Sequence, residues 1–127
     1  MDSACSAALV AAHCARLGLL RAECSAAITS AVMLMLAPGV PVSFAIAGMT
    51  SAHGQCKTWD SRADGYLRGE GCAALLARAV APASAAQASV LATAVRSDGR
   101  SASLTAPSGT AQQLLMRASI GEADRAA

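Results

Sequence analysis

The feature that most constrains the fold is a continuous apolar run, Ala26–Leu36, which is followed after one residue by Pro38-Gly39. A run of this length that ends at turn-forming residues is typical of a buried strand. A helix that spans a membrane needs roughly 20 apolar residues, and Pro38, Gly39 and Pro41 interrupt the stretch too early for that. The run therefore predicts a sheet strand and no membrane span.

Helical spacing of apolar residues appears on both sides of this strand. Leu9, Leu17 and Leu20 indicate a helix over Ser6–Leu20, and a second helix is predicted over Thr110–Ile120. Between them, Val42–Ala47 is expected to form a short helix or turn.

Two more strands are predicted further along the chain. Cys72–Val80 has the pattern of a second buried strand, and Ser89–Val95 alternates enough to be a third. Ala81–Ala88 is expected to join them as a short surface helix or turn. Helices and strands in this mixed order indicate an α/β fold.

Residues 48–71 hold much of the glycine and polar content of the chain. Structureless segments of this length inside a compact domain are usually functional loops. We expect an ordered loop rather than a linker, because Trp59, Tyr66 and Leu67 need surfaces to pack against.

The core that this sequence can build is thin. Aromatic residues make up only 2% of the chain, namely Phe44, Trp59 and Tyr66, and much of the apolar content is alanine. Large aromatic side chains supply much of the buried area in ordinary cores. The composition therefore indicates part of a larger domain.

Charge and cysteine content exclude several classes of protein. Ten basic and eight acidic residues give a net charge of +2 without a basic run, so a nucleic-acid partner is not expected. The five cysteines are odd in number and lack CxxC spacing, which favours neither a zinc site nor a disulfide framework. No signal peptide is visible at the N-terminus, and reduced thiols indicate a cytoplasmic location, with a plastid as a further option.

Cys5 is the best candidate for chemistry from the residues alone. It stands where the first predicted helix begins, among the small neighbours Ser3, Ala4 and Ser6. The positive end of a helix favours the thiolate form of cysteine, and its free N–H groups can stabilise an oxyanion. The alternative is that Cys5 is an inert buried thiol, which is common in proteins.

Four blocks in order along the chain resemble the β-ketoacyl synthase family, most closely the type I modular polyketide synthases. The first, Asp2-Ser3-Ala4-Cys5-Ser6-Ala7-Ala8-Leu9-Val10-Ala11, is similar to the family's active-site segment. The second is Gly48-Met49-Thr50-Ser51-Ala52-His53-Gly54-Gln55-Cys56-Lys57, and the third is Trp59-Asp60-Ser61-Arg62-Ala63-Asp64-Gly65-Tyr66-Leu67-Arg68-Gly69-Glu70-Gly71-Cys72. The fourth combines Asp98-Gly99-Arg100-Ser101 with Leu104-Thr105-Ala106-Pro107-Ser108-Gly109.

The resemblance implies a fold and a reaction. The fold is a thiolase-like, layered α-β-α architecture, of which this chain holds the central portion only. Residues 1–93 would be the C-terminal part of the N-terminal ketosynthase half, and residues 94–127 the start of the C-terminal half. Cys5 would accept an acyl group and then undergo decarboxylative Claisen condensation with a malonyl-type extender, in polyketide or fatty-acid biosynthesis.

The resemblance also implies partners. The substrates would arrive as phosphopantetheine thioesters on an acyl carrier protein, with no cofactor or metal bound directly, and the full-length protein would be a homodimer. Two histidine motifs that assist decarboxylation in the family are not among these 127 residues, so the fragment alone is expected to be inactive in condensation.

Neither histidine of the chain is expected to replace the missing ones. His13 lies two helical turns after Cys5, roughly 12 Å along the helix axis, which is too far for a direct pair. His53 lies beside Gly54 in a predicted turn. The resemblance places Asp64, Arg68 and Glu70 in a buried polar network near the floor of the active site, with Arg68 paired to Glu70 or Asp64.

Two alternatives stay open. One is a single-domain fatty-acid condensing enzyme of the same fold. The other is a non-catalytic, ketosynthase-like protein that only binds an acyl carrier or a partner subunit. Ala7 and Ala8 replace two serines of the family pattern, and Thr29-Ser30-Ala31 stands where Ala-Gly-Gly is usual, which keeps the second alternative in play.

Overall fold

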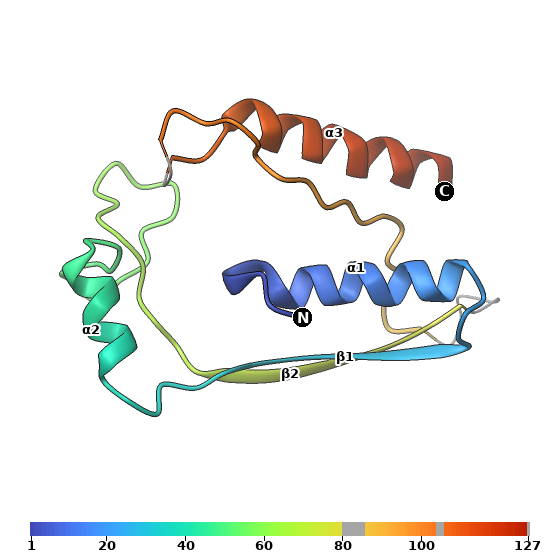
Figure 1. Cartoon of the computed structure of the whole chain (residues 1–127), viewed down its shortest axis with the longest axis horizontal. Coiled ribbons are helices and arrows are strands. Elements are labelled where there is room, and N and C mark those ends of the chain that lie inside the picture. The colour runs from blue at the N-terminus through green and yellow to red at the C-terminus, as the bar shows by residue number, and fades with distance from the viewer. Residues whose placement is uncertain (80–85, 104–105, 127) are drawn as a thin grey trace. The chain divides into compact units, whose positions relative to one another are not determined.

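The computed structural model describes residues 1–79, 86–103 and 106–126, which form two compact units (Figure 1). One unit comprises Met1–Thr29 and Leu75–Ala127, and the other is Ser30–Ala74. In chain order the elements are η1 (Ala4–Ser6), α1 (Ala7–Leu20), β1 (Ala26–Met33), α2 (Gly39–Ile46), β2 (Gly71–Arg78) and α3 (Gly109–Ala126).

Helix α1 confirms the helix predicted over Ser6–Leu20, and it begins at Ala7, directly after the short turn η1. Its end is closed by two backbone hydrogen bonds, from Glu23 N to Gly18 O and from Ala22 N to Leu19 O. This pairing is a Schellman motif, in which the residue after the helix adopts a left-handed conformation that glycine usually provides. Here alanine occupies that position, with φ of 55° at Ala22.

Strands β1 and β2 pair in a two-stranded sheet. The first two predicted strands are therefore confirmed, although β1 ends at Met33 rather than Leu36. The prediction that they are buried is wrong, because the residues of both strands are exposed or half-buried. A strand is covered only when helices or other strands pack on its faces, and periodicity cannot tell whether such layers are present.

The third predicted strand, Ser89–Val95, is wrong. These residues form neither a strand nor a helix in the structure. Alternating side chains favour an extended backbone, but a strand also needs a neighbour to complete its hydrogen bonds. Of the predicted connection Ala81–Ala88, residues 81–85 lie outside the described part of the chain, as does Val80 at the end of the second predicted strand.

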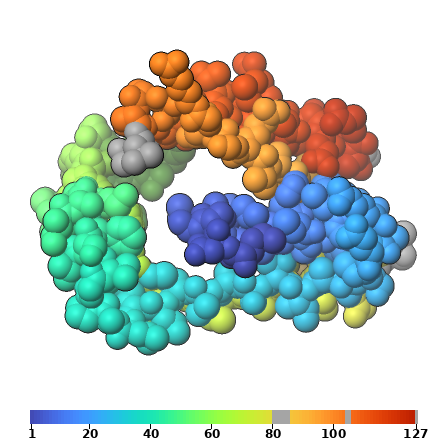
Figure 2. Space-filling view, in the orientation of Figure 1, coloured from blue at the N-terminus to red at the C-terminus, as the bar shows by residue number. Residues whose placement is uncertain are grey.

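Helix α2 confirms the short helix expected near Val42–Ala47, and it starts earlier, at Gly39. Pro41 fits in its first turn, because the first N–H groups of a helix have no partner within the helix. In Figure 2 the side chains of this segment form part of the visible surface, and Val40 and Ile46 are both exposed.

The segment 48–70 forms a long loop, as expected, and a bridge between Thr50 and Tyr66 closes it. Gly65 is required at that closure. Its φ is 137°, and a Cβ there would lie 2.5 Å from the Thr50 carbonyl carbon. The prediction that Trp59 is packed is wrong, because its side chain is 101% exposed.

Helix α3 is longer than predicted and continues through Gly121 to Ala126. Glycine weakens a helix by about 1 kcal/mol relative to alanine, but good helix formers on both sides of Gly121 carry the helix across it. At the other end, the Ser108 hydroxyl accepts a hydrogen bond from Ala111 N, at 3.2 Å, which caps the first turn.

The thin core expected from composition is confirmed. Among the described residues, Leu19 is the only buried hydrophobic side chain. Large apolar side chains on strands, helices and loops reach the surface, among them Ile28, Leu36 and Leu76. Across the described ranges, no helix has both the length and the apolar character needed to cross a membrane.

Candidate active site

Cys5 lies in the middle of η1, the turn that leads into α1, and its side chain is exposed. The residues before it hold the turn closed. Ala4 N donates a hydrogen bond to Asp2 Oδ1 at 3.0 Å. Ser6 Oγ donates to the Ser3 carbonyl at 2.9 Å, and Ser6 N approaches the same oxygen at 3.3 Å. Asp2, Ser3 and Ser6 therefore shape the turn that presents the thiol.

Ala4 adopts a positive φ of 52° immediately before the cysteine. This left-handed region costs a non-glycine residue roughly 1–2 kcal/mol, and such strained residues cluster at functional sites. The turn presents Cys5 at the N-terminal end of a helix that has no acidic residue in its first turn. The exposed thiol of Cys5 therefore lies at the positive end of the α1 helix dipole.

His13 lies further along α1, and its Nδ1 is 2.8 Å from Thr93 Oγ1. The pair lines a cavity of about 290 Å³ in the same unit, together with Ser6, Val10 and Leu115. A hydroxyl partner holds the imidazole in place. The non-catalytic role expected for His13 stays a prediction.

Arg16 fixes α1 to two later segments of the chain, which the sequence did not reveal. Its guanidinium donates to Glu122 Oε1 at 2.8 Å and to the Leu91 carbonyl at 2.7 Å, and its side chain is 15% exposed. The hydrogen bond from Arg16 lowers the pKa of Glu122. No local pattern links residues so far apart, so this contact could not be found from spacing.

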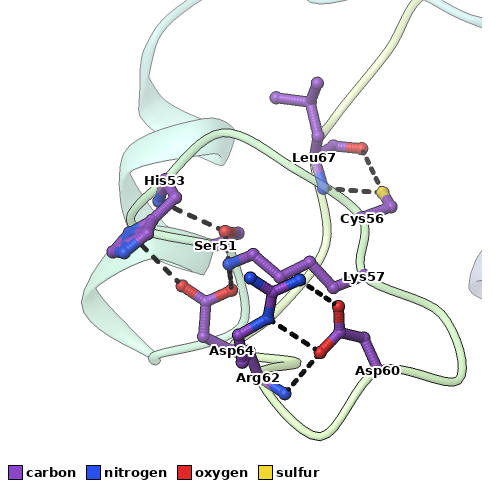
Figure 3. Close-up of polar contacts among 8 residues, drawn as sticks. All are labelled: Ser51, His53, Cys56, Lys57, Asp60, Arg62, Asp64 and Leu67. Carbon is purple, nitrogen blue, oxygen red and sulfur yellow. Dashed lines mark hydrogen bonds and ion pairs between the residues drawn. The ribbon is translucent and has the colours of Figure 1, made fainter.

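A second polar cluster lies in the loop of the other unit and centres on Asp64 (Figure 3). Its carboxylate accepts hydrogen bonds from Lys57 Nζ at 2.7 Å and from Ser51 Oγ at 2.8 Å. His53 Nδ1 lies 3.8 Å from the other carboxylate oxygen. These contacts, the Lys57 hydrogen bond above all, lower the pKa of Asp64 to about 2.

Two further contacts lie in the same loop. Arg62 pairs with Asp60 at 2.7 Å and lowers the pKa of that carboxyl group. The Cys56 sulfur accepts a hydrogen bond from Leu67 N at 3.1 Å, which links the two sides of the loop (Figure 3). His53 is mostly exposed, as expected for a turn residue.

The predicted pairing of Arg68 with Glu70 or Asp64 is wrong. Asp64 accepts a hydrogen bond from Lys57, and the Glu70 carboxylate accepts a hydrogen bond from the Met35 N–H. Arg68 instead stacks on the Phe44 ring, 4.9 Å from its centroid. Asp64 and Glu70 are also exposed rather than buried. The motif alone could not show these partners, because Met35 and Phe44 are distant from it in the sequence.

The described residues hold no group of three or more histidine, cysteine, aspartate or glutamate side chains that could bind a metal ion. All five cysteines are free and exposed.

Comparison with known families decides what kind of chain this is. Residues 1–83 match the model of the β-ketoacyl synthase N-terminal domain. The chain belongs to the β-ketoacyl synthase family. Within this family, Cys5 is the cysteine of the block that resembles the active-site segment.

Curated relatives of this β-ketoacyl synthase chain include polyketide synthases. It is 39% identical over 127 residues to a highly reducing polyketide synthase of Penicillium polonicum, with 97% of this chain covered. It is 41% identical over 120 residues to a component of the phenolphthiocerol/phthiocerol polyketide synthase of Mycobacterium tuberculosis, with 91% covered. The chain spans 5% and 6% of the lengths of these two relatives.

Solved structures confirm the expected fold, a partial thiolase-like α/β domain. The ketosynthase from module 6 of the bacillaene synthase of Bacillus subtilis 168 is 36% identical, with a TM-score of 0.84, over 93% of this chain and 22% of that one. A ketosynthase domain of the oxazolomycin synthase of Streptomyces albus JA3453 is 27% identical, with a TM-score of 0.88, over 98% and 23%.

Proposed function

We propose that this chain supplies the acyl-accepting nucleophile, Cys5, of a ketosynthase domain in a polyketide synthase. The observation that carries the proposal is the exposed thiol of Cys5 on a strained turn at the N-terminal end of α1, in a chain of this family. The partner is an acyl carrier protein that presents its substrates as phosphopantetheine thioesters.

The reaction proceeds in two steps. In the first, the Cys5 thiol loses its proton, and the thiolate attacks the carbonyl carbon of the acyl thioester. The carbon–sulfur bond to the carrier breaks, and the carrier sulfur leaves as a thiolate that takes up a proton in place of the one Cys5 lost. In the second, a malonyl-type thioester loses carbon dioxide. The carbanion that forms attacks the carbonyl carbon of acyl-Cys5, a carbon–carbon bond forms, and Cys5 is released as the thiolate.

The residues around Cys5 act by position. The turn held by Asp2 and Ser3 presents the sulfur to solvent, and the N-terminal end of α1 favours negative charge there. The same positive end would also stabilise the oxyanion that develops on the attacked carbonyl. Decarboxylation needs groups that this stretch does not carry, so the whole reaction belongs to a complete ketosynthase domain, meaning these residues together with the rest of the fold.

Acyl transfer is tested by mass spectrometry on the complete ketosynthase domain. The domain is incubated with a short acyl thioester of N-acetylcysteamine, which mimics the carrier arm, and the labelled peptide is identified. We expect one acyl group on Cys5, and none in Cys5→Ala. Cys14→Ala is the matched control, because Cys14 is an exposed thiol on the same helix. An unlabelled Cys5 would favour the non-catalytic alternative, a protein that only binds a carrier or partner subunit.

Condensation is tested separately from acyl transfer. We propose that the coding sequence beyond Ala127 carries the family's two histidine motifs, and reading that sequence checks it. A stop codon directly after Ala127 would leave acyl transfer possible but remove the proposed condensation.

Further parts of this proposal concern organisation and location. Residues 1–93 are proposed to belong to the N-terminal half of the ketosynthase and residues 94–127 to its C-terminal half, and the family match at residues 1–83 supports the first of these. The proposed homodimer is checked by light scattering on the complete domain. Five free thiols support a reducing compartment such as the cytoplasm.

A further inference from the structure

Arg68 carries a positive charge that this chain leaves incompletely paired. Its Nη1 is 3.5 Å from the Tyr66 hydroxyl, and its Nη2 is 3.7 Å from the Met33 sulfur. Its Nε is buried and has no hydrogen-bond partner. Among the described residues no carboxylate lies within ion-pair distance of Arg68. A buried, unmatched guanidinium N–H is costly, so a missing acceptor is indicated.

The surroundings of Arg68 are apolar and open. The guanidinium lies at one wall of a groove of about 300 Å³, whose other walls are residues 33–37, Val40 and Pro41. Several of these side chains are well exposed, Leu36 at 86% and Val40 at 56%. Such a patch with one cation fits an apolar side chain beside a carboxylate.

We propose that this groove docks a polypeptide segment of the ketosynthase domain that lies outside residues 1–127, and that the segment places an aspartate or glutamate carboxylate on Arg68. Two observations select this occupant. The first is the positive charge of Arg68, which favours an anionic group as its partner. The second is that this chain matches only 22% of the bacillaene ketosynthase chain and 23% of the oxazolomycin one, so most of a ketosynthase domain is available to cover the groove. The proposal rests on the proposed function only in placing this chain in a complete ketosynthase domain.

The deciding experiment is a crystal structure of the complete domain that contains these residues. We expect a carboxylate oxygen from the same polypeptide, outside residues 1–127, within about 4 Å of the Arg68 guanidinium, the usual limit for an ion pair, with an apolar side chain of that segment against Val40. A carboxylate from a second copy, an anion from solution, or no carboxylate at all would each overturn the proposal. This measurement needs no substituted variant.

Thermal unfolding of the same domain gives the energetic test. Arg68→Met should lower the Tm by about 5 °C, because removing one partner of a buried pair leaves the other charge unmatched. Arg62→Met is the matched control from the same loop, where an exposed pair with Asp60 should change the Tm by no more than about 1 °C. Equal shifts would overturn the proposal.

A double-mutant cycle assigns the loss to the pair. Changing the partner carboxylate to its amide should lower the Tm much less in the Arg68→Met variant than in the unsubstituted domain. If the two changes lower the Tm additively, Arg68 and the carboxylate do not form a direct pair. Acyl labelling of Cys5, measured well below the unfolding temperature, should survive Arg68→Met. If the unsubstituted domain fails to label Cys5, the proposed function fails while the Arg68 result still stands.

Discussion

At the scale of single residues, backbone strain and charge pairing define the two polar sites of this chain. Ala4 and Trp59 hold left-handed conformations that glycine would adopt more easily. Ala4 stands directly before the proposed nucleophile, and the Asp2 carboxylate secures it there through a hydrogen bond to its N–H. In the loop, the Asp64 carboxylate contacts the side chains of Ser51, Lys57 and His53.

The strain at Ala4 gives a prediction about acyl transfer. Ala4→Val should slow acylation of Cys5 about fivefold or more, because a β-branched side chain adds roughly 1 kcal/mol to the cost of a positive φ. Ala4→Gly is the control, since glycine accepts this conformation freely, and should label as fast as the unsubstituted domain. Rates from time-resolved mass spectrometry check this. Equal rates for all three would show that the turn is not required.

The pairing of Asp64 gives a prediction about pH. Its pKa is about 2 in the folded chain, against 3.8 for the unperturbed carboxyl group. A depressed folded pKa contributes stability that is present above the unfolded pKa and is lost as the pH falls toward the folded one. The Tm difference between the complete domain and its Asp64→Asn variant should therefore be largest at about pH 5 or above and should shrink at about pH 3.

Differential scanning fluorimetry over this pH range measures that difference. Because Asp64 is partly exposed, added salt should also reduce it. A difference that stays constant from about pH 5 to about pH 3 would mean that Asp64 does not stabilise the loop through its charge.

At the scale of elements, helix ends and long-range side-chain contacts decide where each segment starts and stops. Ser108 caps the first turn of α3, and the turn η1 leads into α1. The last turns of α3 lie beyond Ile120, where the helical spacing of apolar residues ends. Glu122 in these turns forms an ion pair with Arg16 of α1.

The left-handed end of α1 gives a prediction about stability. Ala22→Gly should raise the free energy of unfolding by about 0.5–1 kcal/mol, because glycine has no Cβ to strain the left-handed conformation at this position. This gain should exceed the cost of the greater conformational entropy that glycine gives the unfolded chain. Ala11→Gly, inside the same helix, is the matched control and should lower it by a similar amount. Denaturant unfolding of the complete domain measures both, and a destabilised Ala22→Gly would contradict the assigned cap.

At the scale of the whole molecule, the chain offers far more apolar surface than it buries. Leu19 is the one buried hydrophobic side chain among the described residues, while both faces of the sheet are at least partly open. A chain folds stably only when the free energy gained by burying apolar surface exceeds the conformational-entropy cost of ordering the chain. We therefore expect these residues to be covered by further polypeptide in a complete ketosynthase domain. The chain matches only 22% and 23% of the two solved ketosynthases.

This shortage of buried surface gives a prediction about the isolated 127-residue chain. We expect no cooperative thermal transition in scanning calorimetry, and no condensation activity. The complete domain is the control and should unfold in a sharp transition. A sharp, reversible transition in the isolated chain would show that it folds without the rest of the domain.

The local features of this protein could be predicted from its sequence. Apolar spacing predicted α1, most of α3 and the two paired strands, and four motifs in order indicated the family and the candidate nucleophile Cys5, because these features depend on neighbouring residues. Which distant groups meet became clear from the three-dimensional arrangement: Lys57 with Asp64, Arg16 with Glu122, and Arg68 with Phe44. The same arrangement showed that Ser89–Val95 lacks strand pairing and that Trp59 is exposed. The reason is physical, because pairing and burial depend on what lies beside a residue in space, and periodicity along the chain does not encode that.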